Sequence, residues 1–283
     1  MPSKYIEVCP VGCTASFEAT DIVLPEGALL RCTACGQLVS QIAEADYHRS
    51  MQAFDQAAFN LPNARESQRR HRYARRRLAV ARRLLGAAQE LPRLLDVGCS
   101  RGDFVAAAAQ LGFAAEGVEP APHIAAAARA AGRTVHSGLL EEQKFPDGRF
   151  DVVSLFEVIE HLRAPLPLLK ECARILRPGG ILLISTGNAA SWTARTMKAR
   201  WDYFQIEQDA GHVSFFNPRS MALLAGRAGF ELAALSTGRV RFSEKGKLPA
   251  WAHAASKLAA EALSLPARLA GRGHDMLAYL RRP

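Results

Sequence analysis

The sequence lacks long apolar runs. Its strictly aliphatic stretches are only a few residues long, as in ILLI at residues 181–184, whereas a membrane-spanning helix needs about 20 apolar residues. The first ten residues, MPSKYIEVCP, also lack the charged and apolar regions of a secretory signal. These absences predict a soluble, cytoplasmic protein whose thiols stay reduced.

Acidic residues are in the minority, with 27 Asp and Glu against 36 Lys and Arg, so the formal net charge is +9. Such an excess favours an acidic partner, a nucleic acid or an anionic membrane surface. Much of it lies in one block, RESQRRHRYARRRLAVARR at residues 65–83, whose pattern predicts a helix with a thin apolar stripe. The arginines form either a solvated helix face or a patch that contacts phosphate groups.

Four of the six cysteines lie within the first 35 residues, as two close pairs, Cys9 with Cys13 and Cys32 with Cys35. Thiolates spaced in this way converge on a tetrahedral zinc ion, although the first pair encloses one residue more than a standard zinc knuckle. A disulfide framework is the alternative, and the predicted cytoplasmic location disfavours it. We therefore expect a structural zinc ribbon over residues 1–45, with every metal position taken by sulfur.

Short apolar runs alternate with helical segments from residue 91 onward. This alternation is typical of an α/β fold, an open and mostly parallel sheet with helices on both faces. Ligands of such sheets bind beyond the carboxyl ends of the strands. The predicted strands are residues 93–97, 115–118, 134–136, 150–156 and 180–186, and the predicted helices are residues 103–111, 123–131 and 166–176.

The turn after the first predicted strand reads DVGCSRGDF, from Asp96 to Phe104. Gly98 and Gly102 allow a ligand to approach the backbone, because they carry no side chain. Glu119 ends the next predicted strand, 23 positions after Asp96, where a carboxylate can accept hydrogen bonds from both ribose hydroxyls of a nucleoside. The G-x-G-x-x-G pattern of dinucleotide dehydrogenases is absent.

The same turn resembles the first motif of class I S-adenosylmethionine-dependent methyltransferases, D-x-G-x-G-x-G, with Ser100 in place of the central glycine. FPDGRFDVVSLFEVIEHLRAPLPLLKECARILRPGGILLISTGN resembles the family from its fourth to its fifth strand, including LRPGG at residues 176–180. FFNPRSMALLAGRAGFEL, at residues 215–232, resembles the helix and strand that follow. The resemblance covers roughly residues 75–240 and implies a Rossmann-like methyltransferase fold.

The resemblance also implies how the methyl donor is held. The glycine turn would line its methionine part, Glu119 would hold the ribose, and the carbonyl of Phe156 would accept from its amino group. The acidic residue that often meets the adenine is missing after the third strand, so this contact passes to backbone groups near Leu139 or to Glu141. The implied cofactor-binding positions are Asp96, Gly98, Ser100, Gly102, Glu119, Leu139 and Phe156.

A second motif, E-x-x-E-H followed by a distant histidine, comprises Glu157, Glu160, His161 and His212. It resembles the divalent-metal site of small-RNA 2′-hydroxyl methyltransferases and of ubiquinone-pathway O-methyltransferases. Mg²⁺, Mn²⁺ or Zn²⁺ there would lower the pKa of an acceptor hydroxyl. In the alternative interpretation these side chains brace the loop, and His161 or His212 acts as general base.

Two segments interrupt the predicted alternation of strands and helices. Residues 191–208 are rich in aromatic side chains and follow the fifth strand, which favours a substrate lid over a helix packed on the core. Residues 245–272 predict a basic helical insertion, broken by Pro249 and Pro266, that packs on the core or rests on an anionic membrane. The resemblance to the methyltransferase family, which usually closes its sheet with an antiparallel strand, implies that residues 275–282 form this final strand.

We therefore expect a zinc ribbon, a basic helical linker over residues 46–90 and a methyltransferase domain over residues 91–283. A cysteine ribbon joined to such a domain resembles bacterial methyltransferases that modify sugars or cell-surface glycan precursors, so a saccharide or another small-molecule hydroxyl is the expected acceptor. The alternatives are an RNA ribose 2′-hydroxyl, a ubiquinone-type phenol, or a non-catalytic module that binds a partner. An N-P-P-Y motif for methylating base amines is absent.

Overall fold

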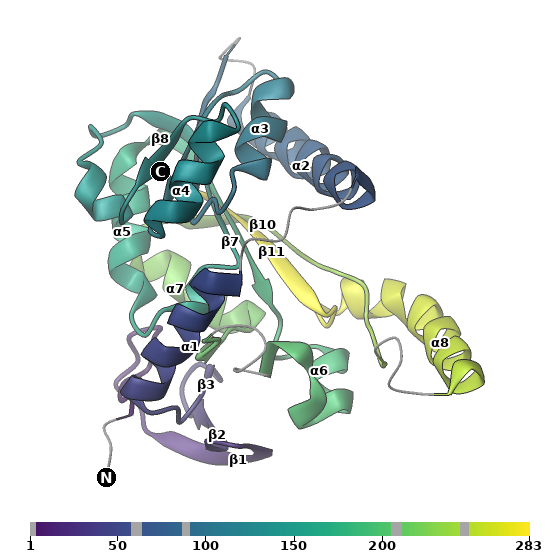
Figure 1. Cartoon of the computed structure of the whole chain (residues 1–283). Helices are drawn as coiled ribbons and strands as arrows, with labels where there is room; N and C mark the ends of the chain where they lie inside the picture. The colour runs from purple at the N-terminus through teal and green to yellow at the C-terminus, as the bar shows by residue number, and fades with distance from the viewer. Residues whose placement is uncertain (1–3, 58–63, 87–90, 205–210, 244–248) are drawn as a thin grey trace.

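Seven strands form the central sheet of the computed structural model (Figure 1). They are β4 (Arg93–Val97), β5 (Ala114–Glu119), β6 (Val135–Ser137), β7 (Phe150–Phe156), β8 (Leu176–Gly187), β10 (Glu231–Thr237) and β11 (Asp275–Arg281). Their order is β10-β11-β8-β7-β4-β5-β6. β4 to β8 pair in parallel, whereas β11 runs antiparallel to both β8 and β10. The structure describes residues 4–57, 64–86, 91–204, 211–243 and 249–283.

Helices cover both faces of this sheet. They are α2 (Ala64–Leu85), α3 (Asp103–Gln110), α4 (Pro122–Ala130), α5 (Pro165–Ile175) and α7 (Pro218–Arg227). Leu78 of α2 and Ala108 of α3 are buried in one hydrophobic cluster with strand residues, and Leu169 of α5 and Leu224 of α7 are buried in another. β7 is buried along its length except at Phe156, as expected for a parallel strand covered on both sides. The predicted α/β fold is confirmed.

The basic segment at residues 65–83 forms most of α2, as predicted. Ala74, Leu78 and Ala81 are its buried stripe, and they share spacings of three and four residues that place them on one helix face. Most of its described arginines are exposed on the outer side. α2 is therefore one of the helical layers of the sheet.

The cysteine-rich segment forms a second sheet that also uses a strand from much later in the chain. Its strands are β1 (Phe17–Leu24), β2 (Gly27–Cys32), β3 (Leu38–Val39) and β9 (Ser214–Phe215), in that order. β3 pairs antiparallel with β9, with Leu38 opposite Phe215 and Val39 opposite Ser214. We call residues 4–43 the ribbon segment. Helix α1 (Glu44–Ala57) follows it.

The predicted lid segment contributes to the core between the two sheets. Its described part forms α6 (Trp192–Met197) and the short 3₁₀ helices η3 (Lys198–Arg200) and η4 (Asp202–Phe204), and residues 205–208 lie outside the described residues. Trp201 and Phe204 are 0% and 1% exposed and share a hydrophobic cluster with Leu29 of β2 and Phe215 of β9. These two rings pack as core residues.

The insertion before the last strand forms α8 (Ala250–Leu269), while residues 245–248 lie outside the described residues. The helix starts directly after Pro249, and, contrary to the prediction, it does not break at Pro266. Proline removes one N–H and crowds the preceding turn; here it stands in the last turn, and its own carbonyl accepts from Ala270 N–H at 3.0 Å. No helix within the described part of the chain is long and apolar enough to cross a membrane.

Replacing Phe215 with alanine tests whether the ribbon segment and the central sheet form one cooperative unit. Phe215→Ala removes a buried ring that contacts Phe204, with ring centroids 4.8 Å apart, and should cost about 3–5 kcal/mol. We expect one thermal transition at a lower temperature, observed equally by circular dichroism and by tryptophan fluorescence. Val23→Ala, at a position that is 65% exposed, is the control and should change stability by less than about 0.5 kcal/mol. An early transition confined to the ribbon segment would contradict this prediction.

Candidate functional site

A tight turn joins the end of β4 to α3. Gly98, Ser100 and Gly102 have φ values of 71°, 48° and 71°. A Cβ on Gly98 would lie 2.7 Å from Cγ2 of Val158, so this position needs glycine for both space and conformation. Ser100 adopts the left-handed conformation with a side chain, which costs about 1–2 kcal/mol. The turn therefore keeps its backbone open to a ligand.

Glu119 connects this turn to the end of β5. Its carboxylate accepts hydrogen bonds from the backbone N–H of Ser100 at 2.8 Å and of Ala121 at 3.0 Å. The residue is buried, with 7% of its surface exposed. Because an ionised carboxylate offers about four lone-pair sites, Glu119 can accept further hydrogen bonds from a sugar while it holds the turn.

Asp96 lies at the end of β4, beneath the turn. Its carboxyl accepts a hydrogen bond from Oγ of Ser154 at 2.6 Å. Burial raises the pKa of Asp96 to about 7, an effect that the Ser154 hydroxyl and the nearby Arg77 charge only partly offset. Asp96 is therefore partly protonated near neutral pH.

Helix α2 supplies one wall of this site, which sequence reasoning did not identify. Arg70, Tyr73, Ala74 and Arg77 line a cavity of about 210 Å³ together with the β4 turn. The Arg77 guanidinium lies over the Phe156 ring, 4.4 Å from its centroid. The four wall residues have spacings of three, one and three, which mark one face of a helix, so this face could have been recognised within the basic block.

The structure brings together part of the predicted cofactor set. Asp96, Gly98, Ser100 and Phe156 line the cavity. The other three predicted positions lie outside this lining: Gly102 is the N-cap of α3, Glu119 stands behind the turn, and Leu139 follows β6, where it is 55% exposed.

The E-x-x-E-H motif follows β7 and forms a second cluster. One ligand atom each from Glu160, His161 and His212 lies within 4.8 Å of the others. Glu160 and His161 belong to the short helix η2 (Ile159–His161), and His212 precedes β9. Glu160 is 1% exposed, and neither carboxylate oxygen has a hydrogen-bond partner among the described residues. These residues of the motif therefore lie close together, and the buried carboxylate of Glu160 lies near the imidazoles of His161 and His212.

Glu157 lies beside this cluster but is held differently. Its carboxylate accepts hydrogen bonds from Oγ of Ser185 at 2.9 Å and from the hydroxyl of Tyr203, and its φ of 55° is left-handed. The structure thus groups three of the four predicted residues and places the fourth at the adjacent wall, with Tyr203 as a contact that the motif alone does not reveal.

Burial controls the charge of these groups. It raises the pKa of Glu157, and it raises the pKa of Glu160 well above the usual range, where the charge of Glu157 adds to the effect. Burial also lowers the pKa of His212 to about 3, with a further contribution from His161. His212 is therefore neutral at physiological pH, the form in which imidazole binds metals or accepts a proton.

The ribbon segment and α1 hold the backbone of this second cluster. The hydroxyl of Tyr47 donates to the carbonyl of His161 at 2.9 Å. The N–H of Val213 donates to the carbonyl of Glu160 at 2.9 Å, and the carbonyl of Val213 accepts from the N–H of Ser40 at 2.9 Å. Residues far apart in the chain thus fix the segment that carries His212.

A second cavity, of about 480 Å³, lies between the ribbon segment and α6. Its lining includes Ala189 and Ala190, which follow β8, and is rich in basic side chains. Asp21 is its one acidic lining residue and forms an ion pair with Lys198 at 2.7 Å. The basic residues of the lining are Arg31, Arg195, Lys198 and Arg272.

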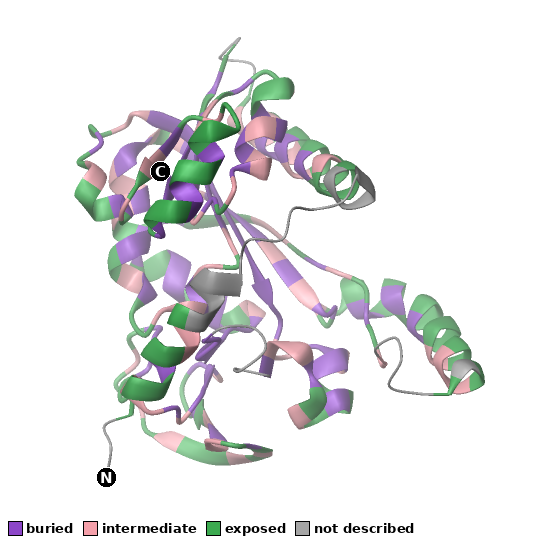
Figure 2. Ribbon diagram, in the orientation of Figure 1, coloured by how far each residue is buried: buried purple, intermediate pink, exposed green. Residues whose placement is uncertain are grey.

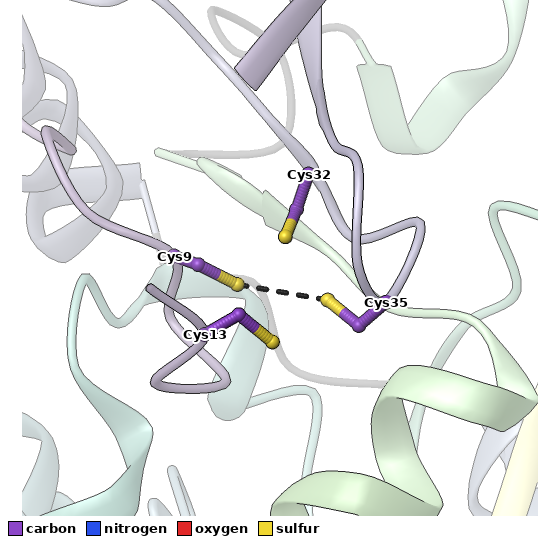
Figure 3. A group of neighbouring side chains, drawn as sticks. All are labelled: Cys9, Cys13, Cys32 and Cys35. Carbon is purple, nitrogen blue, oxygen red and sulfur yellow. Dashed lines mark hydrogen bonds between the residues drawn. The ribbon is translucent and has the colours of Figure 1, made fainter. Parts of the chain in front are cut away.

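The four N-terminal cysteines point toward one another (Figure 3). All their sulfur atoms lie within 4.8 Å of each other, and the Cys9 and Cys35 sulfurs are 3.6 Å apart. Sulfur ligands at about 2.3 Å from a tetrahedral zinc ion stand at a similar separation from one another. Arg227 of α7 reaches this cluster, with its guanidinium 3.8 Å from Sγ of Cys13.

A family model described as a methyltransferase domain matches residues 65–235. The chain belongs to this methyltransferase domain family. This confirms the resemblance to class I S-adenosylmethionine-dependent methyltransferases that the glycine turn and LRPGG indicated.

Curated relatives of this methyltransferase domain include bacterial enzymes named ubiquinone biosynthesis O-methyltransferase. The one from Thiobacillus denitrificans is 29% identical over 154 residues, covering 51% of this chain and 66% of the relative. The one from Cereibacter sphaeroides is 35% identical over 148 residues, covering 49% and 60%. The chain thus spans less than two thirds of the length of either relative.

Solved structures confirm the methyltransferase fold. A SAM-dependent methyltransferase from Thermotoga maritima has a TM-score of 0.51 at 20% identity, covering 83% of this chain and 100% of that chain. The [4+2]-cyclase SpnF has a TM-score of 0.54 at 18% identity, covering 84% and 97%. Because the same fold carries a cyclase, the fold alone does not decide the reaction.

Asp96→Asn tests the burial of the carboxyl group under the glycine turn. Folded Asp96 keeps its proton up to about pH 7, so the wild type loses stability as the pH rises from the ordinary aspartate pKa to that value. The uncharged variant avoids this loss. We expect equal stability below about pH 4 and a variant more stable by about 2–4 kcal/mol at pH 8, measured by urea denaturation without ligand. Asp46→Asn, at a side chain 53% exposed, is the control, and a pH-dependent gain at Asp96→Asn no larger than that of this control would refute the prediction.

Proposed function

We propose that this chain is an S-adenosylmethionine-dependent O-methyltransferase that acts on a hydroxyl of a small-molecule acceptor. Membership of the methyltransferase domain family supports S-adenosylmethionine as the methyl donor. Relatives named as O-methyltransferases support an oxygen atom as the methyl acceptor. The observation that carries the proposal is the adjacency of the glycine turn at β4 and the carboxylate-imidazole cluster after β7, since neighbouring parallel strands end at the same edge of the sheet.

The residues of the first site fit the donor. Gly98 lines the cavity with backbone alone, because Val158 leaves no room for a Cβ there. Glu119 can accept from the ribose, and the carbonyl of Phe156 can accept from the amino group. Arg77 supplies a cation at the cavity for the donor's carboxylate. When bound, S-adenosylmethionine supplies a methyl group on a positively charged sulfur, which is a good leaving group. These residues then contribute mainly by aligning the methyl carbon with the acceptor oxygen.

The residues of the second site fit a divalent cation. Glu160 is buried with both oxygens unpartnered among the described residues, and carboxylate with neutral imidazole is a donor set for Mg²⁺, Mn²⁺ or Zn²⁺. The cation would be held by Glu160, His161 and His212, with Glu157 at its side, and would lower the pKa of an acceptor hydroxyl. Without a cation, neutral His212 or His161 serves as the general base.

A saccharide or glycan-precursor acceptor is a more specific proposal, and the second cavity supports it. Four basic side chains and one acidic one line this space beside the end of β8, so it suits an acceptor that carries phosphate or carboxylate groups. Phosphate-linked sugars have this chemistry. A ubiquinone-type phenol, favoured by the names of the relatives, and an RNA ribose remain the alternatives.

The experiment that tests the enzymatic proposal combines calorimetry with methyl transfer. We expect purified protein to bind S-adenosylmethionine and S-adenosylhomocysteine, and to move a radiolabelled methyl group to one of three acceptor pools: phosphate-linked sugars, catechols or RNA. Alkali-stable label on oxygen in either small-molecule pool supports the proposal. If the protein does not bind the donor, the interpretation as a non-catalytic module remains. If the label appears in RNA alone, the acceptor is RNA and not a small molecule.

Glu160→Gln tests the cation. Because the substitution removes the buried charge that would hold the metal, we expect kcat to fall roughly 100-fold or more with unchanged donor binding. EDTA should inhibit the wild type, and Mn²⁺ or Mg²⁺ should restore it. Glu231→Gln, on the exposed start of β10, is the control. Activity that resists EDTA yet disappears in His212→Ala would instead indicate general-base catalysis.

We also propose that the four N-terminal cysteines hold a structural zinc ion. The proposal is supported by their convergence and by the backbone turns that bring Gly12 N–H to the carbonyl of Cys9 and Gly36 N–H to that of Cys32, at 2.7 and 2.9 Å. Four sulfur ligands leave no open position, so the ion would stabilise the ribbon segment and take no part in methyl transfer.

Elemental analysis of purified full-length protein tests the zinc. We expect one zinc ion per chain in the wild type and a large loss in Cys32→Ser, with a lower melting temperature because metal binding contributes directly to folding. Cys172→Ala, which changes a buried cysteine of α5 outside the cluster, should retain the zinc. Zinc-free protein of unchanged stability, or a disulfide found by mass spectrometry, would disprove this site.

A further inference from the structure

Helix α8 exposes a line of large apolar side chains. Trp251, Leu258, Leu265 and Leu269 are 77%, 74%, 64% and 82% exposed. Their spacings of seven, seven and four residues return to one side of an α-helix, so they form a stripe along a helix of about 30 Å. Figure 1 shows α8 projecting away from the central sheet, and Figure 2 shows most of its surface exposed.

The opposite face of α8 holds the helix on the protein. Ala260, Ser264 and Ala267 are buried there, and the alanines share a cluster with Val240, Trp192 and Phe242. A soluble surface helix normally buries its large apolar residues and exposes polar ones. In α8 the small residues face inward and the large ones face outward, so internal packing does not account for the stripe.

The charge around the stripe is positive. Residues 239–275 contain seven Lys and Arg against three Asp and Glu. Lys257 and Arg268 are both exposed and stand eleven residues apart, about three turns, so they share one flank of the stripe. Glu261, the acidic residue of the helix, lies on the same flank, four residues after Lys257, and its charge is balanced by Arg239 at 3.4 Å. An apolar stripe with cations along one flank is a pattern that binds an anionic lipid surface.

We propose that α8 docks this protein on an anionic lipid bilayer, with its apolar stripe at the headgroup boundary and Lys257 and Arg268 against acidic headgroups. Charge favours this occupant over a second copy of the chain, because each copy carries a formal net charge of +9 and two copies therefore repel each other. Within the described residues no helix can span a bilayer, so α8 lies on the surface.

The end of α8 adjoins the wall of the second cluster. The carbonyl of Arg272 accepts from the N–H of Trp192 at 3.0 Å, and Nε1 of Trp201 donates to Nδ1 of His274 at 3.2 Å. His274 also contacts Tyr203, the partner of Glu157, with ring centroids 5.9 Å apart. Docking through α8 would therefore bring the carboxylate-imidazole cluster after β7, where the acceptor is proposed to react, close to the bilayer. This consequence rests on the proposed function, whereas the docking itself does not.

Vesicle flotation with the full-length protein tests the docking. We expect binding to vesicles of equal phosphatidylcholine and phosphatidylglycerol, little binding to phosphatidylcholine alone, and weaker binding at high salt. The combined variant Trp251→Gln, Leu258→Gln, Leu265→Gln should reduce the bound fraction at least tenfold. The matched control is Val23→Gln, Leu91→Gln, Leu223→Gln, at positions 65%, 59% and 39% exposed elsewhere on the protein, and it should bind like the wild type.

Tryptophan fluorescence separates insertion from surface adsorption. Trp251 is the exposed tryptophan, since Trp201 is fully buried and Trp192 is half-buried, so vesicles should shift the emission to shorter wavelength and Trp251→Phe should remove the shift. Absence of flotation at low salt, or equal flotation of the stripe variant, would overturn the proposal. A wild-type dimer in light scattering that the stripe variant abolishes, without lipid binding, would assign the stripe to a second copy instead. Donor binding, measured in parallel, reports on the proposed function separately.

Discussion

The candidate acceptor site depends on the short antiparallel pairing of β3 with β9. His212 lies one residue before β9, and Val213 between them is held from both sides. Its carbonyl accepts from Ser40 of the ribbon segment, while its N–H donates to the carbonyl of Glu160. The distance between His212 and Glu160 is therefore set by backbone hydrogen bonds, which leave less freedom than side-chain contacts do.

The hydrophobic core between the two sheets makes this pairing rigid. Trp201 and Phe204 come from the segment after β8, yet they are buried in the same cluster as Leu29 and Val39 of the ribbon segment. Arg227 of α7 also donates to the carbonyl of Val11 beside the cysteines. Because the ribbon segment shares its core with the methyltransferase domain, loss of its structure would disturb the segment that carries His212. A zinc ion in the ribbon segment can thus matter for activity without touching substrate.

The two sites were predictable to different degrees. The sequence placed Asp96, Gly98 and Glu119 around one turn, because a tight strand-to-helix turn and a carboxylate at the next strand end leave a local signature; their roles stay predictions. The cysteine pairs are similarly local. Arg77 and Tyr203 were missed, because α2 and the segment after β8 reach the sites only through packing. The E-x-x-E-H motif identified its residues but did not reveal that Glu157 turns to Tyr203 while Glu160 faces the histidines.

The sequence by itself determined the alternation of strands and helices, the glycine turn, the thiol pairs and the basic helix, because these depend on backbone preferences and on spacings of a few residues. Only the tertiary structure decided that residues 38–39 pair with residues 214–215, that α2 forms a wall of the cavity at the β4 turn, and that α8 turns its large side chains outward. The reason is physical. Local patterns state which residues prefer to be buried, whereas the choice of partner is made by the shape and hydrogen bonding of surfaces that exist only after the chain has folded.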